Sequence, residues 1–129
     1  MMKAHAKRTV YYRYPAELVW KALGAGNNRE VDPLSEEEFD NREPAPNMVF
    51  TKALDIRTNE LFAIRMKAHG FISDLRIELK PVGPCETKVV FSEDVEYREF
   101  STFFLSRFGL SVRQELRSFA NEIHKRLGD

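Results

Sequence analysis

The sequence has little of what marks secreted, membrane or nucleic-acid-binding proteins. It contains one cysteine, Cys85, so no disulfide can form within the chain and a reducing compartment is expected. Its 20 basic and 20 acidic residues cancel, which argues against a nucleic-acid binder because such proteins usually carry a basic excess. No apolar run reaches the roughly 18 residues of a membrane span, and the first residues lack the apolar core of a signal peptide. We therefore expect a cytoplasmic protein with no membrane span and no nucleic-acid partner.

Catalytic and metal-binding motifs are missing as well. The chain has no G-x-S-x-G, H-E-x-x-H, P-loop or G-x-G-x-x-G pattern. His5, His69 and His124 are not within metal-ligand spacing of one another or of Cys85, and all three are expected at the surface. Cys85 follows a Gly-Pro pair and is expected to be an inert thiol in a turn. No metal or other cofactor is expected, and no catalytic residue is defined.

Length and composition indicate one globular domain. The 129 residues predict a single domain, 1–129, that is large enough to fold without disulfides or metal. Apolar residues make up 43% of the chain and charged residues 31%, an ordinary globular balance.

Local patterns predict strands framed by two helices. Pro15 suits the first position of a helix over 16–23 that Gly24 ends. The acidic stretch 30–43 contains Ser35 and Glu38 at capping-box spacing, so it forms either a short helix or a loop leading into an edge strand. The predicted strands are 9–14, 48–56, 61–68, 71–80 and 87–97, with a turn over 81–84.

Period-two alternation in the last three strands predicts an antiparallel sheet with one buried face. The side expected to be buried consists of every second residue, starting from Phe62, Phe71 and Thr87 in the three strands. Arg65 and Lys67 lie on the side expected to face solvent. A helix must cover the buried face. If 99–127 is one helix, its apolar side carries Leu105, Phe108, Val112, Leu116, Phe119, Ile123 and Leu127. These patterns predict an α+β fold in which a curved antiparallel sheet wraps around a long C-terminal helix.

Two segments resemble a known superfamily. The stretch from Val10 to Leu23, VYYRYPAELVWKAL, is similar to the opening strand and Pro-Ala/Glu-x-x-Val-Trp helix start of the START/polyketide cyclase/Bet v 1-like (SRPBCC) superfamily. The stretch from Phe100 to Leu127 resembles its long gripping helix. The resemblance implies a helix-grip fold and leaves the function open, because the superfamily is functionally diverse.

Two charged residues share the parity of apolar neighbours. Lys52 has the same parity as Phe50, and Glu93 the same parity as Phe91, so both are expected to reach into the space between sheet and helix. A buried charge is costly unless it is paired or wetted, so such residues mark a polar spot or a cavity. A β-bulge or a strand end would instead turn one of them outward. The candidate ligand-binding residues are Tyr12, Phe50, Lys52, Phe62, Met66, Leu75, Phe91, Glu93 and Phe108.

The function predicted first is binding of a hydrophobic small molecule or lipid between the sheet and the C-terminal helix. Ten phenylalanines are compatible with such a pocket and equally with a filled core. One alternative is a cyclase- or aromatase-like enzyme in which Lys52, Glu93 or a tyrosine performs acid–base work. Another is a protein-interaction module, for example a homodimer through Phe100, Phe103 and Leu110, unless Gly109 breaks the helix and reorients these residues.

Overall fold

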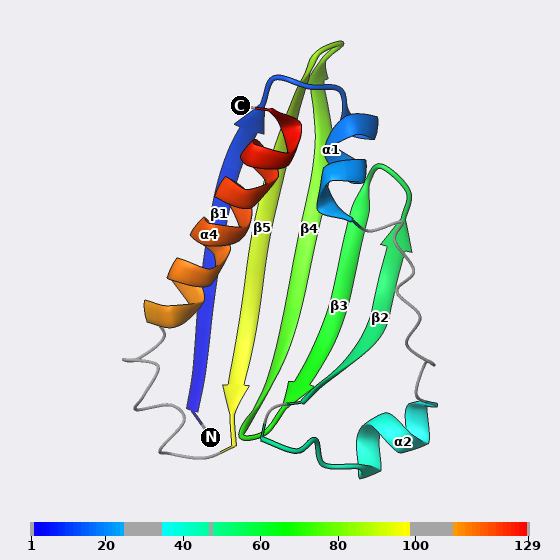
Figure 1. Ribbon diagram of the computed structural model, residues 1–129, viewed down its shortest axis with the longest axis vertical. Helices are drawn as coiled ribbons and strands as arrows, with labels where there is room; N and C mark the ends of the chain where they lie inside the picture. The colour runs from blue at the N-terminus through cyan, green and yellow to red at the C-terminus, as the bar shows by residue number, and fades with distance from the viewer. Residues whose placement is uncertain (1, 25–34, 47, 99–109, 129) are drawn as a thin grey trace.

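The computed structural model describes residues 2–24, 35–46, 48–98 and 110–128 of the chain. Figure 1 shows a single sheet with helices against it. In chain order the elements are β1 (Met2–Tyr12), α1 (Ala16–Leu23), α2 (Glu36–Asn41), β2 (Val49–Arg57), β3 (Leu61–Ala68), β4 (Phe71–Gly83), β5 (Glu86–Tyr97) and α4 (Leu110–Leu127).

The sheet has five antiparallel strands in the order β1-β5-β4-β3-β2. The strands bend along their length; α4 runs along β1 and β5, and α1 packs on the same side over β4 and β5 (Figure 1). We call this covered side the inner face and the opposite side the outer face. The predicted α+β architecture, an antiparallel sheet curved around a C-terminal helix, is confirmed.

The hydrophobic core lies on the inner face, as the alternation predicts. Every second residue of β5 from Thr87 to Tyr97 is buried, and the register pairs these residues with the alternating set that begins at Phe71 in β4. Helix α4 turns its predicted apolar side to the sheet, with Leu116 and Ile123 buried, while Arg117 is exposed. The core residues are Ala6, Tyr12, Val19, Trp20, Ala22, Leu23, Ile77, Leu79, Val89, Phe91, Val95, Tyr97, Leu116, Ala120 and Ile123.

Helix α1 forms where the sequence predicts it. Pro15 occupies the N-cap with extended backbone angles, one position earlier than expected. Gly24 adopts the left-handed conformation, with φ 73°, and its N–H donates to the Lys21 carbonyl. Glycine takes this conformation without a Cβ penalty, so it ends the helix at Leu23.

Two strands are longer than predicted. Strand β1 begins at Met2 because it pairs with β5 along its whole length, Met2 lying opposite Tyr97. Strand β4 extends into the predicted turn 81–84 and ends at Gly83, with a register shift between Pro81 and Gly83. Cross-strand pairing overrides the weak strand propensity of these end residues, as is common for sheets.

The acidic stretch contains a helix, α2, rather than only a loop. The Ser35 hydroxyl accepts a hydrogen bond from the Glu38 N–H at 3.1 Å, so the predicted cap is confirmed. Within the described part of the chain α4 begins at Leu110. The predicted helical segment 99–109, with Phe100, Phe103 and Phe108, lies outside the described residues, as does the Leu110 side chain.

None of the helices in the described ranges is long and apolar enough to cross a membrane.

Candidate functional site

Most of the predicted ligand-binding residues lie on the inner face. The register joins Phe62 to Ile77 and Leu75 to Glu93, and Ile77 is fully buried in the core shared with α4. The inward orientation is confirmed for Tyr12, Phe62, Met66, Leu75, Phe91 and Glu93. Phe108 lies outside the described residues. That these residues bind a ligand stays a prediction.

The prediction that Phe50 and Lys52 point into the space between the sheet and the C-terminal helix is wrong. The register pairs Phe50 with Lys67 and Lys52 with Arg65, which alternate with the inward-facing Met66 and therefore lie on the outer face. The two residues do share a face, as expected, but β2 has the opposite phase. Apolar and polar residues do not alternate regularly along β2. The residue pattern within this strand was therefore insufficient to show which side of the sheet Phe50 and Lys52 occupy.

Helix α2 supplies the cover that buries these outer-face side chains. The Arg42 guanidinium, just after α2, lies 5.5 Å from the centroid of the Phe50 ring. The Lys52 ammonium lies 5.2 Å from the centroid of Phe39, the buried residue of α2. Such cation–π contacts suit partly exposed sites. Phe50 is therefore covered by Arg42, the residue that follows α2, on the side of the sheet opposite α1 and α4.

Lys67 fastens α2 to the outer face. The sequence predicted Lys67 on the solvent-exposed side of β3. It does lie on that side, the outer face, but its side chain is buried, with 1% exposure. Its ammonium donates to the carbonyls of Phe39 at 2.9 Å and Asp40 at 3.1 Å and lies 3.8 Å from a Glu43 carboxylate oxygen. A cation at the C-terminal carbonyls of a helix is favourable, so Lys67 is a structural clamp.

The inner face carries a polar pair that the clamp does not touch. Ser73 is opposite Val95 and Leu75 is opposite Glu93, so Ser73 and Glu93 are diagonal neighbours on adjacent strands. Ser73 is 1% exposed and Glu93 is 2% exposed. The Ser73 hydroxyl has no hydrogen-bond partner within the described residues. A buried polar group in this state costs free energy, so this spot can accept a partner from outside the chain.

The described side chains around the polar pair are apolar, and several of them are half-buried. Ile77, two residues beyond Leu75, is fully buried, and α1 reaches as far as Phe62, whose ring meets Trp20 edge to face at 6.3 Å. Beyond Phe62 the apolar side chains of β3 and β4 are in partial contact with solvent. These half-buried inner-face residues are Ile64, Met66, Phe71 and Leu75. Half-buried apolar side chains therefore adjoin the two buried polar ones on the inner face.

Tyr12 belongs to the core of this face. It is fully buried, and its hydroxyl donates to the Ala120 carbonyl of α4 at 2.9 Å. Burial raises the pKa of the Tyr12 phenol above its ordinary value, an effect that the positive charge of Arg8 opposes. Its ring lies 4.5 Å from that of His124, which is half-buried rather than at the surface as predicted. Tyr12 therefore stays protonated and joins β1 to α4.

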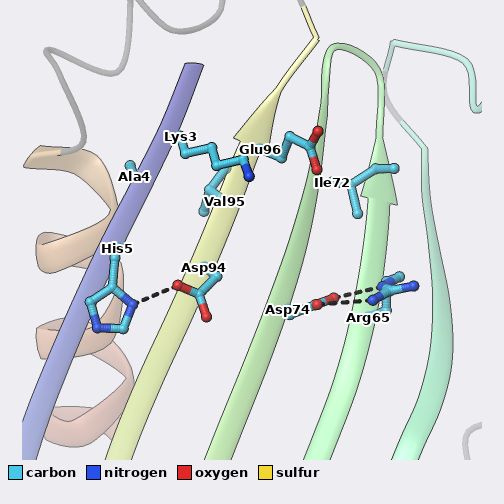
Figure 2. Close-up of a pocket in the computed structure, with 9 residues that line it drawn as sticks. All are labelled: Lys3, Ala4, His5, Arg65, Ile72, Asp74, Asp94, Val95 and Glu96. Atoms are coloured by element: carbon cyan, nitrogen blue, oxygen red, sulfur yellow. Dashed lines mark hydrogen bonds and ion pairs between the residues drawn. The ribbon is translucent and has the colours of Figure 1, made fainter. Parts of the chain in front are cut away.

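A hollow of about 550 Å³ lies on the outer face, across β1, β5, β4 and β3 (Figure 2). Figure 2 shows two pairs that span it, with α4 behind the sheet. Arg65 donates to both carboxylate oxygens of Asp74, at 2.7 and 3.0 Å, and His5 Nδ1 lies 2.6 Å from Asp94. The hydrogen bond to Asp74 raises the pKa of Arg65 further. These charges are already paired, so the hollow is a weaker candidate site.

The other sequence candidates remain at the surface. His5 and His69 are exposed, as predicted, and Cys85 is exposed in the turn between β4 and β5. No three histidine, cysteine, aspartate or glutamate side chains come together as a possible metal site in the part of the chain that the structure describes.

Ser73 and Lys67 are the informative residues that sequence reasoning missed. Ser73 shares the inward parity of Phe71 and Leu75, which was visible, but a lone serine in an apolar row carries no distinctive signal. The signal for the outer-face cover was Phe39, an apolar residue inside an acidic capped helix, because such a residue has to be buried against something.

Searches by sequence give no matching family model and no matching curated protein. Solved structures do match. Truncated norcoclaurine synthase from Thalictrum flavum is 11% identical with a TM-score of 0.64, over 99% of this chain and 95% of that one. A Streptomyces aromatase/cyclase is 16% identical with a TM-score of 0.57, over 96% and 93% of the two chains. A conserved protein from Geobacillus kaustophilus is 14% identical with a TM-score of 0.61, over 94% and 93%.

These similarities extend over nearly the whole chain and confirm the fold that the sequence resemblance implied, the helix-grip fold of the START/polyketide cyclase/Bet v 1-like superfamily. At such low identities they establish the fold alone, because one fold supports many functions.

Proposed function

We propose that this protein binds an apolar small molecule that carries a hydrogen-bond donor, such as an amine or a hydroxyl group, on the inner face of its sheet. Ser73 and Glu93 take the polar end of the molecule. Ile64, Met66 and Leu75 contact its apolar body.

The observation that carries the proposal is a buried polar pair among half-buried apolar side chains. Leaving the Ser73 hydroxyl without a partner costs about 1–3 kcal/mol, which a ligand donor or acceptor would recover. A carboxylate such as Glu93 accepts hydrogen bonds only, so a ligand with a donor group matches it better than one with a carboxylate of its own. Ligand pockets generally combine an apolar lining with a few polar groups in this way.

The structural neighbours support the ligand class. Norcoclaurine synthase from Thalictrum flavum has been solved in complex with dopamine and hydroxybenzaldehyde, and it is 11% identical to this chain with a TM-score of 0.60. Both molecules are small and aromatic, and dopamine has an amine. The same fold is thus able to enclose a molecule of the proposed kind.

A fluorescence titration tests the proposal. N-phenyl-1-naphthylamine is apolar, has one N–H donor and becomes brighter in apolar surroundings. We expect saturable binding with a Kd of about 1–100 µM, the range of a small pocket with modest polar contacts. Met66→Trp should fill the inner-face surface and weaken binding about tenfold. Ile72→Trp is the matched control, because Ile72 alternates with Ser73 and lies on the outer face.

Competition separates the polar requirement from simple hydrophobicity. Dodecylamine should displace the probe at lower concentration than dodecanoate, because the acid brings a second carboxylate towards Glu93. Ser73→Ala and Glu93→Gln should reduce this preference. Absence of saturable binding, or equal loss in Met66→Trp and Ile72→Trp, would refute the proposal.

A cyclase-type enzyme is the second candidate, and one observation favours it. Glu93 is a carboxylate at 2% exposure on the face where a substrate would lie, which is the placement of a general base. Mass spectrometry of a bound molecule over time distinguishes the two functions. Chemical conversion by the wild type that Glu93→Gln abolishes without loss of binding would assign catalysis; an unchanged ligand would assign binding alone.

A further inference from the structure

The outer face of the β4–β5 ladder carries two pairs of like charges in direct opposition. Asp74 lies opposite Asp94, and Lys80 lies opposite Lys88. Like charges directly across a strand pair destabilise a sheet. Each pair therefore needs compensation by opposite charge.

The aspartate pair is compensated within the chain. Arg65 on β3 binds Asp74 through two hydrogen bonds at 2.7 and 3.0 Å, and His5 on β1 contacts Asp94 at 2.6 Å. Figure 2 shows these partners on either side of the two carboxylates. Each of the two aspartates thus has a partner on the strand next to it.

The lysine pair has no such partners. Neither Lys80 nor Lys88 forms an ion pair or hydrogen bond with any side chain that the structure describes. Both line a hollow of about 330 Å³ on the outer face. Of the two carboxylates in that hollow, Glu78 is bound by Arg76 at 2.6 Å, and Glu60 contacts neither lysine.

The surroundings of the lysine pair are charged and partly aromatic. Arg57 and Arg76 also line the hollow, but each is paired with a carboxylate, Arg57 with Asp55 at 3.1 Å and Arg76 with Glu78 at 2.6 Å. Lys80 and Lys88 are therefore the cations of the hollow that have no such partner among the described residues. Tyr11 lies opposite Lys88 on β1, is 54% exposed and extends the row to three strands. Two lysines at directly opposed positions that both line such a hollow match an oxyanion, since charge-assisted hydrogen bonds from both would neutralise it.

We propose that this outer-face hollow binds a phosphate-type oxyanion, a phosphomonoester group held between Lys80 and Lys88. The site is on the opposite side of the sheet from Ser73 and Glu93, so it is independent of the inner-face function. The Tyr11 ring flanks the group that carries the phosphate. The phosphomonoester belongs either to a soluble molecule or to a lipid headgroup.

An NMR titration of the ¹⁵N-labelled protein with inorganic phosphate, with potassium chloride adjusted to constant ionic strength, tests the site. Saturable shifts are expected at the amides around Lys80 and Lys88. Lys80→Gln/Lys88→Gln should weaken binding about tenfold or more, the effect of losing two charge-assisted hydrogen bonds. Lys3→Gln/Lys7→Gln is the control, with the same charge change on the same face but opposite Glu96 and Ser92.

The variant has a second readout that does not depend on added phosphate. Removing the opposed charges should raise the thermal unfolding midpoint at low salt in Lys80→Gln/Lys88→Gln but not in the control. Shifts scattered over all lysines, or equal weakening in both double variants, would overturn the proposal.

Vesicles identify the source of the phosphomonoester. Retention of the wild type, and not of Lys80→Gln/Lys88→Gln, on phosphatidylcholine vesicles containing phosphatidic acid assigns a lipid headgroup. Phosphate binding in solution without retention on these vesicles assigns a soluble phosphomonoester. Absence of both kinds of binding refutes the site.

Discussion

Among the described residues each face of the sheet buries one charged side chain, and the two lie in different surroundings. On the outer face Lys67 is surrounded by acceptors, the carbonyls of Phe39 and Asp40 and the carboxylate of Glu43. On the inner face Glu93 has apolar cross-strand neighbours, Ala6 and Leu75. Lys67 therefore supports the structure of the outer face, whereas the proposed function uses Glu93, set among apolar cross-strand neighbours, as part of a ligand site on the inner face.

The largest expected effect concerns the inner face, which holds the domain together. Leu116→Ala and Ile123→Ala should each lower the free energy of unfolding by about 2–5 kcal/mol, because both truncate fully buried side chains of α4. Urea denaturation measures the change. Arg117→Ala, at an exposed position of the same helix, should cost less than about 0.5 kcal/mol. Equal costs in the three variants would show that the assigned face of α4 is wrong.

The next effect contrasts the two buried charges directly. Lys67→Met keeps the apolar stem but leaves the two α2 carbonyls without their donor, so it should cost about 1–3 kcal/mol. The loss should be local, with faster amide exchange in Glu36–Asn41 than in β5. Glu93→Gln has nearly the same shape and keeps a side-chain oxygen that accepts hydrogen bonds, so it should cost less than Lys67→Met. A larger cost for Glu93→Gln than for Lys67→Met would reverse the roles given to the two faces.

A smaller effect is expected from the hydroxyl that joins β1 to α4. Tyr12→Phe should cost about 1 kcal/mol at pH 7 because it removes the bond to the Ala120 carbonyl. Since burial raises the pKa of Tyr12, the neutral phenol is favoured in the folded state. Its contribution is complete below about pH 10, the ordinary pKa of tyrosine, and is lost as the pH rises towards the folded-state pKa. The stability gap between wild type and Tyr12→Phe, measured by urea denaturation, should therefore narrow above about pH 10. A gap that widens there would contradict a raised pKa.

The smallest effect is expected at the outer-face ion pair. Arg65 and Asp74 form a bidentate pair, but each side chain is 39% exposed and screened by water. Arg65→Gln should cost less than about 1 kcal/mol, and the cost should fall further in 0.5 M salt. Thermal unfolding at two salt concentrations measures it. A cost that salt leaves unchanged would mean that the pair is effectively buried.

Sequence reasoning was most successful where two independent patterns agreed. In β4 and β5 the alternation is long and uninterrupted, so the inner face and the inward placement of Glu93 followed from it. Helix α1 was bounded by Pro15 and Gly24, whose backbone preferences are local.

The same reasoning failed where the outcome depends on a contact between distant segments. The face of Phe50 and Lys52 is set by α2 packing on the outer side, and nothing within β2 reports that contact. The burial of Lys67 has the same cause, since its partners are 27 and 28 residues away. For the site, Glu93 was identifiable as a charge among apolar residues, but Ser73 became visible only because its hydroxyl is buried and has no hydrogen-bond partner among the described residues.

The inner-face site is tested most directly by locating a bound molecule against two isoleucines on opposite faces. Ile64 and Ile72 lie on neighbouring strands, Ile64 opposite Leu75 on the inner face and Ile72 opposite Lys67 on the outer face. In protein with labelled isoleucine and methionine methyl groups, saturated with N-phenyl-1-naphthylamine, intermolecular NOEs should connect the probe to Ile64 and Met66 and not to Ile72. NOEs to Ile72 without any to Ile64 or Met66 would contradict the assignment of binding to the inner face.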